Sequence, residues 1–127
     1  MRFTRQASLN RAQQFARVRA SGVSTAGRFL VLSALALEDP TAPSKFGVIC
    51  TKKVGHAVMR NTLKRRVREL VRAHADAYAS GYYMVIILRW RAAEASYQEL
   101  EKDWLKTEKR LNKELAKQKA ASTVTQS

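Results

Sequence analysis

The sequence predicts an α+β fold, a single domain in the order α-β-β-α-β-α whose helices pack on a small sheet. Three observations indicate this class. The chain has 127 residues, of which 46% are apolar, so it has the length of one domain and enough apolar side chains for a core. Residues 82–90 form an apolar run rich in β-branched and aromatic side chains, as in a buried strand. Residues 59–78 and 97–115 repeat their apolar side chains with the period of a helix.

The N-terminal part predicts one helix and two strands. Residues 9–20 place apolar side chains at helical spacing, with Ser8 or Asn10 as possible N-caps. Residues 28–37 are rich in Phe, Leu and Val and end at the turn EDPTAPS, which contains two prolines. Residues 45–53 alternate their side chains between two faces, so we expect them to pair with the preceding strand as a hairpin.

The C-terminal half predicts a helix, a strand and a second helix. The helix over 59–78 follows the break VGHAV and ends before ASG. The strand over 82–90, YYMVIILRW, is apolar on both faces at its centre, which indicates a buried strand. The segment 97–115 predicts a long amphipathic helix. We expect the domain to span residues 1–119 and residues 120–127 to form a disordered tail.

Positive charge dominates the sequence and is concentrated in two segments. The formal net charge is +14; residues 1–37 carry six arginines and no acid, and residues 46–91 carry ten basic residues and two acids. This excess indicates a polyanionic partner, either nucleic acid or an anionic membrane surface. No apolar run approaches the roughly 20 residues that a membrane-spanning helix needs. The arginine-rich N-terminus also suits a mitochondrial transit peptide, although its helical pattern favours a folded segment.

The charge of the central helix falls on one side. At about 100° per residue, one arc collects Arg60, Asn61, Lys64, Arg65, Arg68 and Arg72. The opposite arc collects Met59, Leu63, Val67, Leu70 and His74. The helix therefore separates a basic face from a core face; Arg66 lies outside the basic arc, and Glu69 is expected to pair with neighbouring arginines. Like charges this close repel by roughly 0.2–0.5 kcal/mol per pair, so a partner outside the chain must offset the cost.

A phosphate-binding helix is the interpretation that this face favours. Arginine suits phosphate because its planar fork can donate two hydrogen bonds to one group. A solvated face usually mixes Glu with Lys, and a membrane-surface helix carries Trp or Phe on its apolar side, so we expect no membrane partner. We also expect no DNA partner, because no helix-turn-helix pattern is present. A structural RNA-binding protein, such as a ribosomal component, stays possible on composition alone.

No catalytic or metal-ligating pattern is apparent in the chain. His56 and His74 are its two histidines, and neither belongs to a set with the spacing of metal ligands. We therefore expect no catalytic residue and no metal site. The single cysteine, Cys50, alternates with core positions, which predicts a buried, inert thiol and fits a reducing, cytoplasmic compartment. Tyr97 and Trp104, at helical spacing, are expected in the core.

The basic helix and the turn before it resemble a known signature. The run from Lys53 to Arg72 resembles KVGxAVxRNxxKRxxRExxR, the signature of the bacterial ribonuclease P protein subunit, and the flanks agree over about residues 5–115. The resemblance implies a left-handed crossover between the second and third predicted strands, where the general rule favours a right-handed one. It also implies a subunit that assists a catalytic RNA in removing the 5′ leader of precursor tRNA, with Mg²⁺ bound mainly by the RNA.

The resemblance further implies two binding regions. The residues that would face the ribonuclease P RNA are Lys53, Arg60, Asn61, Lys64, Arg65, Arg68 and Arg72. The residues that would contact the leader, in a cleft between the first helix and the sheet, are Phe15, Arg19, Lys52, Phe29 and Phe46. Members of the family often carry aromatic residues where this sequence has Arg19 and Ser33. We therefore expect leader contact here to depend more on charge and less on stacking.

Overall fold

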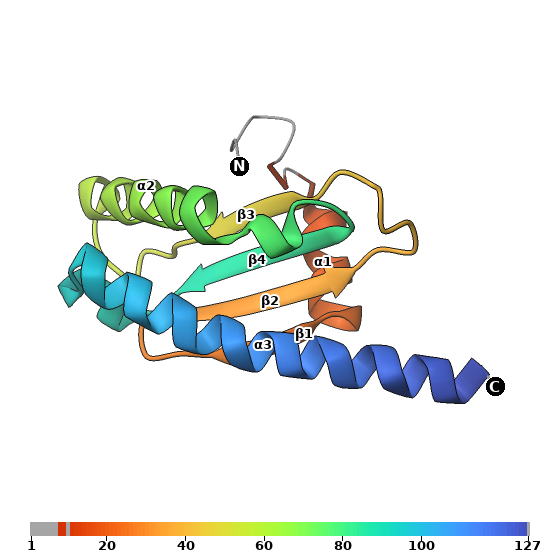
Figure 1. Ribbon diagram of the computed structural model, residues 1–127. Helices are drawn as coiled ribbons and strands as arrows, with labels where there is room; N and C mark the ends of the chain where they lie inside the picture. The colour runs from red at the N-terminus through yellow and green to blue at the C-terminus, as the bar shows by residue number, and fades with distance from the viewer. Residues whose placement is uncertain (1–7, 10, 127) are drawn as a thin grey trace.

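A four-stranded mixed sheet organises the chain, and helices cover both of its faces (Figure 1). The computed structural model describes the backbone of residues 8, 9 and 11–126 and the side chains as far as Lys119. In chain order the main elements are α1 (Ala12–Ser21), β1 (Val23–Ala26), β2 (Leu30–Ala36), β3 (Lys45–Ile49), α2 (Ala57–His74), β4 (Tyr82–Leu88) and α3 (Tyr97–Gln126). The short 3-10 helices η2 (Asp76–Tyr78) and η3 (Trp90–Glu94) flank β4.

The strand order in the sheet is β1-β2-β4-β3, with β1–β2 and β2–β4 antiparallel and β3–β4 parallel. The predicted hairpin between the strands now seen as β2 and β3 is therefore wrong, because β4 lies between them. The two central strands, β2 and β4, each bury most of their residues, as expected for strands with a neighbour on each side. The sequence also missed β1, whose four residues alternate between half-buried and exposed positions.

The parallel pair is joined by α2 and forms a β-α-β unit. In Figure 1 both arrows point left and α2 passes in front of the sheet, so the step from β3 down to β4 has the left-handed sense. This agrees with the resemblance and departs from the general rule for such crossovers. The arrangement brings the start of α2 close to the end of β3, at the same edge of the molecule.

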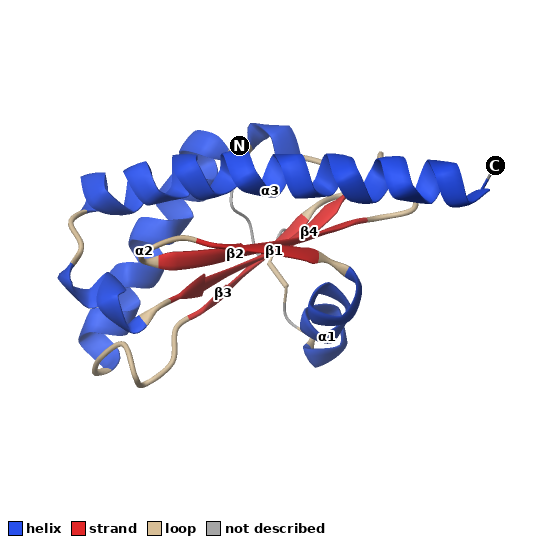
Figure 2. Cartoon of the chain, turned by 90° about the horizontal axis from the view of Figure 1, so that it is seen from below, coloured by secondary structure: helices blue, strands red, loops and turns tan. Residues whose placement is uncertain are grey.

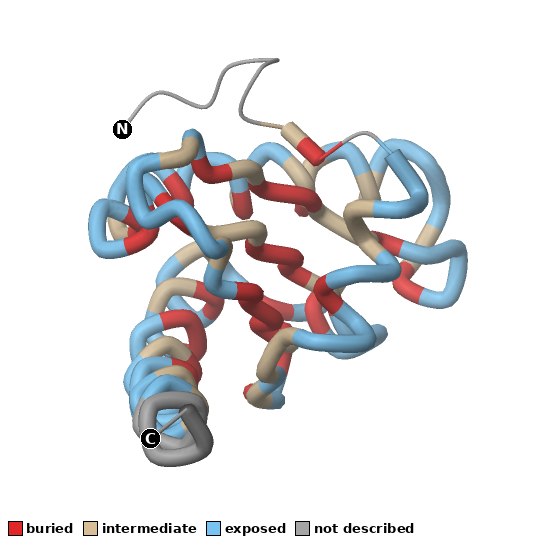
Figure 3. Tube along the Cα trace, turned by 90° about the vertical axis from the view of Figure 1, so that its right-hand side faces the viewer, coloured by how far each residue is buried: buried red, intermediate tan, exposed pale blue. Residues whose placement is uncertain are grey.

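The two faces of the sheet carry different layers. Figure 2 shows α3 and α1 on opposite sides of the strands. The larger core packs side chains of α2 and α3 against one face, and a smaller cluster, Leu9, Val18, Leu35 and Val85, joins α1 to the other. Buried positions follow the strands and the inward sides of the helices (Figure 3). Because α1 is only ten residues long, it covers part of its face and leaves the rest open.

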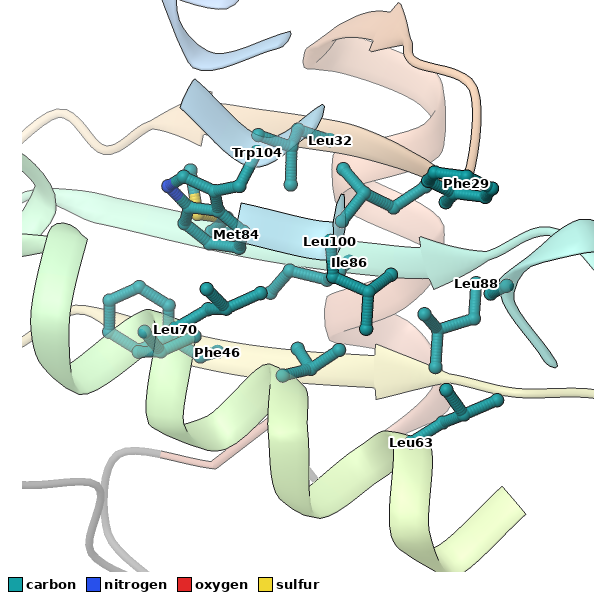
Figure 4. Packing of buried hydrophobic residues seen from close by; sticks show 14 of the residues in the cluster. Phe29, Leu32, Phe46, Leu63, Leu70, Met84, Ile86, Leu88, Leu100 and Trp104 are labelled. Atoms are coloured by element: carbon teal, nitrogen blue, oxygen red, sulfur yellow. The ribbon is translucent and has the colours of Figure 1, made fainter. Parts of the chain in front are cut away.

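Large apolar side chains from α2 and α3 fill the larger core (Figure 4). Leu63 and Leu70 of α2, and Leu100 and Trp104 of α3, have no exposed surface. The Trp104 indole donates from Nε1 to Glu108 Oε2 at 3.1 Å, so its polar atom is satisfied within the fold. The prediction of Trp104 as a core residue is confirmed, and Tyr97 packs partly buried against the same cluster.

The ends of the terminal helices differ from their predicted positions. Helix α1 begins at Ala12 with Arg11 as N-cap; of the predicted caps, Ser8 instead bridges to Phe46, and Asn10 lies outside the described residues. Helix α3 continues to Gln126, past the predicted start of a tail at residue 120. The side chains after Lys119 and residue 127 lie outside the described residues, so a disordered tail stays a prediction.

Candidate nucleic-acid interface

Helix α2 turns a basic face away from the core. Its apolar positions Leu63, Val67, Leu70 and Val71 are fully buried. On the other side, Asn61, Arg65, Arg68 and Arg72 are exposed, and Arg60 and Lys64 are half-buried. We call these six polar residues the basic face. The structure therefore brings the predicted arc together on one surface.

One acid accompanies the cations of α2, and it is paired. Glu69 is the only acidic residue of the helix, and its Oε1 lies 2.5 Å from Arg72 Nη1. Both side chains are about half exposed, so the pair contributes at most about 1 kcal/mol to stability. Among the described residues, the other cations of the basic face form no ion pair on α2, so the surface stays strongly positive.

Arg66 points away from the basic face, as its position in the helix predicted. Its Nη1 donates a hydrogen bond of 3.2 Å to the carbonyl oxygen of Ala95, in the segment before α3. Arg66 therefore joins α2 to the segment before α3. Its sequence neighbour Arg65 lies on the basic face instead.

The half-buried cations of the basic face lie close to the end of β3. Burial raises the pKa of the Cys50 thiol, while the nearby charges of Lys64 and Arg60 act in the opposite direction. The Nε of Arg60 is buried and has no hydrogen-bond partner within the described residues. Cys50 is buried, as predicted.

The turn before α2 extends the positive surface. Lys52 and Lys53 are exposed in this turn, which a hydrogen bond of 3.0 Å from Val54 N to Thr51 O closes. The first turn of α2 contains no acid, and its N-cap, His56, makes no capping hydrogen bond from its side chain. Neither the N-cap nor the first turn therefore neutralises the positive end of the helix dipole, which adds to the charge of the two lysines.

A groove separates α1 from the open part of the sheet. It has a volume of about 140 Å³ and is lined by Phe15, Val18, Arg19, Ser24, Val31, Ser33, Ile49, Val85 and Ile87. We call it the α1 groove. It is the cleft that the resemblance implied between the first helix and the sheet, and it contains two of the predicted leader-contacting residues, Phe15 and Arg19.

The position of Phe15 depends on a glycine in β3. A Cβ added to Gly47 would lie 2.6 Å from Cε1 of the Phe15 ring, so the ring lies directly on the strand backbone. Helix α1 is held nearby by the buried Val18 and by Arg17, whose guanidinium lies 5.6 Å from the centre of the Tyr83 ring. These contacts leave one side of Phe15 facing the groove and Arg19 exposed beside it.

The structure does not bring Phe29 and Phe46 to the α1 groove. Both lie in the larger core on the other face of the sheet, with 8% and 1% of their surface exposed. Alternation along β3 explains the error, because Phe46 and Val48 face α2 whereas Gly47 and Ile49 face α1. Lys52 is not a lining residue either, since it lies in the turn beyond β3.

Sequence reasoning missed the strand residues that make the floor of the groove. Val31, Ile49 and Ile87 lie on the face that α1 leaves partly open, and each is half-buried. Ser24 was missed because β1 was missed. The available signal was alternation, since Val31 and Ser33 of β2 must share a face opposite to the buried Leu30, Leu32 and Ala34.

Comparison with known proteins decides the family. The family model described as ribonuclease P matches residues 3–112. The chain belongs to the ribonuclease P protein family. Curated relatives named ribonuclease P protein component include one from Desulforamulus reducens, 35% identical over 107 residues that cover 84% of this chain and 93% of the relative. Another, from Bacillus cereus strain B4264, is 36% identical over 103 residues, which cover 80% of this chain and 88% of the relative.

Solved ribonuclease P proteins share the fold. The Staphylococcus aureus RNase P protein superimposes with a TM-score of 0.72 at 23% identity, covering 81% of this chain and 93% of that one. The Thermotoga maritima RNase P protein gives a TM-score of 0.66 at 23% identity, covering 78% of this chain and 92% of that one. Together with the curated relatives, these matches make the chain a protein component of ribonuclease P, an endoribonuclease of tRNA 5′ processing, with RNA as its partner in a ribonucleoprotein.

Membership of the ribonuclease P family implies magnesium. Among the described residues, no group of three or more His, Cys, Asp and Glu side chains is placed to bind a metal ion. The described residues therefore offer no complete set of protein ligands for magnesium, and we assign no metal ligand among them. Within the same part of the chain, no helix is both long and apolar enough to cross a membrane.

Proposed function

We propose that this chain binds the ribonuclease P RNA through the basic face of α2 and the 5′ leader of precursor tRNA in the α1 groove. By binding both, it assists the magnesium-dependent removal of the leader, and the magnesium is held mainly by the RNA. The observation that carries the proposal is the basic face itself, with its cations on the solvent side of one helix that contains a single acid. Lys52 and Lys53, exposed in the turn before α2, extend this surface.

The basic face would act by charge and by the geometry of its hydrogen-bond donors. Arg60, Arg65 and Arg68 can each hold a phosphate with two parallel hydrogen bonds, and Asn61 adds a neutral donor and acceptor. If about five phosphates are contacted, the logarithm of the association constant should fall with the logarithm of salt concentration at a slope of roughly −3.5 to −4.5. Neutralised phosphates repel one another less, so the assembled RNA should need less magnesium to fold and bind substrate.

The α1 groove would hold the leader by contact with its bases and phosphates. Phe15 offers a ring face for stacking, and the exposed Arg19 offers charge at the edge. With one aromatic ring and one arginine, this leader site would depend more on charge than a site lined by several aromatic residues. The proposed compartment is the cytoplasm, which the buried single cysteine fits, and the proposed partners include neither DNA nor membrane.

Reconstitution with the cognate RNA tests this function. The complex is expected to process precursor tRNA at low millimolar magnesium, a concentration at which the RNA alone is much less active. A matched control adds a variant in which Arg60 and Arg65 are changed to alanine, which should restore the higher magnesium requirement. Equal activity with and without the protein over a full magnesium titration would disprove the proposal.

A further inference from the structure

A pair of serine hydroxyls interrupts an otherwise apolar floor in the α1 groove. Ser24 of β1 and Ser33 of β2 are directly opposite each other in the sheet, and their Oγ atoms lie 2.6 Å apart. The neighbouring floor positions are Val31 of β2, Ile49 of β3, and Val85 and Ile87 of β4. Ser33 is buried, whereas Ser24 is exposed, so the pair can be reached from the groove.

The hydrogen-bonding capacity of this pair is only partly used within the described chain. Two hydroxyls carry two protons and four lone pairs, and their mutual hydrogen bond uses one of each. One O–H donor and several lone pairs remain. In an apolar setting, an unused donor is costly unless water or a ligand pairs with it. The pair can therefore offer a ligand one donor and one acceptor side by side.

The size of the groove limits what can enter it. Its volume of about 140 Å³ is well below the roughly 300–1,000 Å³ of sites that enclose a whole drug-sized molecule. It suits one flat ring, with the rest of the ligand outside. Phe15 supplies a flat wall next to the floor, and the exposed Arg19 lies where a phosphate attached to that ring could be paired.

We propose that the Ser24–Ser33 pair binds the polar edge of one unpaired leader nucleobase and does not choose among the four bases. This inference rests on the proposed function of the groove. Each natural base presents a donor next to an acceptor on its pairing edge, and rotatable hydroxyls can match either order. A ring without a polar edge would instead leave the hydroxyls unpaired.

This mode of recognition differs measurably from stacking. An aromatic platform accepts any flat ring, because every base has a π face. A hydroxyl pair accepts any natural base but discriminates against an apolar ring of the same shape. Such a site fits an enzyme component that must handle leaders of different sequence while still holding one nucleotide in place.

The test uses the holoenzyme assembled from this chain and its cognate RNA. Precursor tRNAs carry an apolar base isostere, a difluorotoluene nucleotide, at one leader position at a time, and their dissociation constants are measured. One position is expected where the isostere weakens binding about three- to tenfold, the effect of one or two hydrogen bonds. At that position the four natural bases should differ by less than about threefold, within the effect of a single hydrogen bond.

Serine variants connect this effect to the pair. The double variant S24A/S33A should bind the natural precursor more weakly and should no longer distinguish it from the isostere. S24A alone, at the exposed position, removes one hydroxyl of the pair and should reduce the discrimination without changing a buried side chain. The control S80A, at an exposed serine outside the groove, should retain full discrimination.

Four outcomes would overturn the inference and can be told apart. If the leader adds affinity over mature tRNA but no position responds to the isostere, the hydroxyl pair does not bind a base. If discrimination persists in S24A/S33A, other residues bind the base edge. If precursor tRNA with one natural base at that position binds more than about tenfold more tightly than with the others, the site selects by sequence. A difference of that size corresponds to at least one hydrogen bond that only one base can form. If the leader adds no affinity at all, the proposed function of the groove fails as well.

Discussion

The basic face of α2 comes from a single helix, whereas the α1 groove is assembled from α1 and all four strands. The basic face presents exposed charge on one side of a helix, which would attract RNA phosphates over a distance. The groove presents a small apolar space with one hydroxyl pair and one exposed arginine, Arg19. In our proposal both contact RNA, but the first would supply affinity and the second would position one segment. Substitutions in the basic face should therefore change the affinity for RNA and its salt dependence, whereas substitutions in the groove should change only the binding of leader-bearing tRNA.

The largest effect is expected from the basic face. Changing Arg60 and Arg65 together to alanine removes two charge-assisted contacts of about 1.5–3 kcal/mol each, which corresponds to a loss of roughly 10²-fold or more in affinity for the ribonuclease P RNA. The salt dependence of binding should also flatten, by about 1.4–1.8 in slope. Binding is measured by titration at several salt concentrations.

A pair of lysines on α3 provides the control for that experiment. Lys109 and Lys113 are exposed and lie on a helix whose charges are nearly balanced. Changing both to alanine removes the same net charge but should leave the salt slope nearly unchanged. If the two double variants flatten the slope equally, the protein binds RNA by its overall charge and the basic face has no special role.

A smaller effect, confined to the leader, is expected from the groove. Phe15→Ala removes a base-stacking surface worth about 1–3 kcal/mol, so precursor tRNA should bind roughly tenfold more weakly. Mature tRNA, which lacks the leader, should bind as before, and so should the RNA subunit. Leu105→Ala, at an exposed apolar residue of α3, is the control. Equal losses for precursor and mature tRNA would remove Phe15 from the leader site.

Arg66 sharpens the comparison because it lies beside Arg65 in the sequence but outside the basic face. Arg66→Ala removes the hydrogen bond to the Ala95 carbonyl and should lower the free energy of unfolding by about 1 kcal/mol, measured in urea. The salt slope of RNA binding should stay unchanged. A flattened slope with unchanged stability would place Arg66 on the RNA surface instead.

The basic face could be predicted from the sequence because its geometry is local. The position of each α2 residue around the helix follows from its number alone, so even the exclusion of Arg66 was predicted correctly. Glu69 was expected to pair with a neighbouring arginine, and it pairs with Arg72. The core faces of α2 and α3 follow from the same periodicity, as Trp104 shows.

The groove could not be predicted in detail because it depends on which strands are neighbours. Strand pairing is decided by contacts between distant residues, and the sequence does not show that β4 lies between β2 and β3. The side chains of Phe46 and Gly47 leave opposite faces, so the aromatic residue enters the core and the glycine makes room for Phe15. An aromatic residue near the right place in the sequence was therefore not sufficient evidence for a contact.

Glu108 of α3 is a partly buried acid that belongs to neither region, so it provides a test of stability that should leave RNA binding unchanged. Burial raises the pKa of Glu108 above its ordinary value of 4.5, although the hydrogen bond from Trp104 acts in the opposite direction. A raised pKa in the folded state means that folding favours the protonated acid. The associated stability is therefore present at and below pH 4.5 and is lost as pH rises through the folded pKa.

Glu108→Gln should remove this pH dependence, because the amide is neutral at every pH and its oxygen can still accept from Trp104 Nε1. Relative to the unmodified chain, the variant should gain stability as pH rises from 4.5 toward neutrality, with the gain measured by urea unfolding at several pH values. Other acids, such as Glu99 with its lowered pKa, contribute equally to both proteins and cancel in the difference. A difference that is constant with pH would show that Glu108 is solvated in the folded chain. The salt slope for RNA and the preference for leader-bearing tRNA should both stay unchanged, since Glu108 belongs to neither surface.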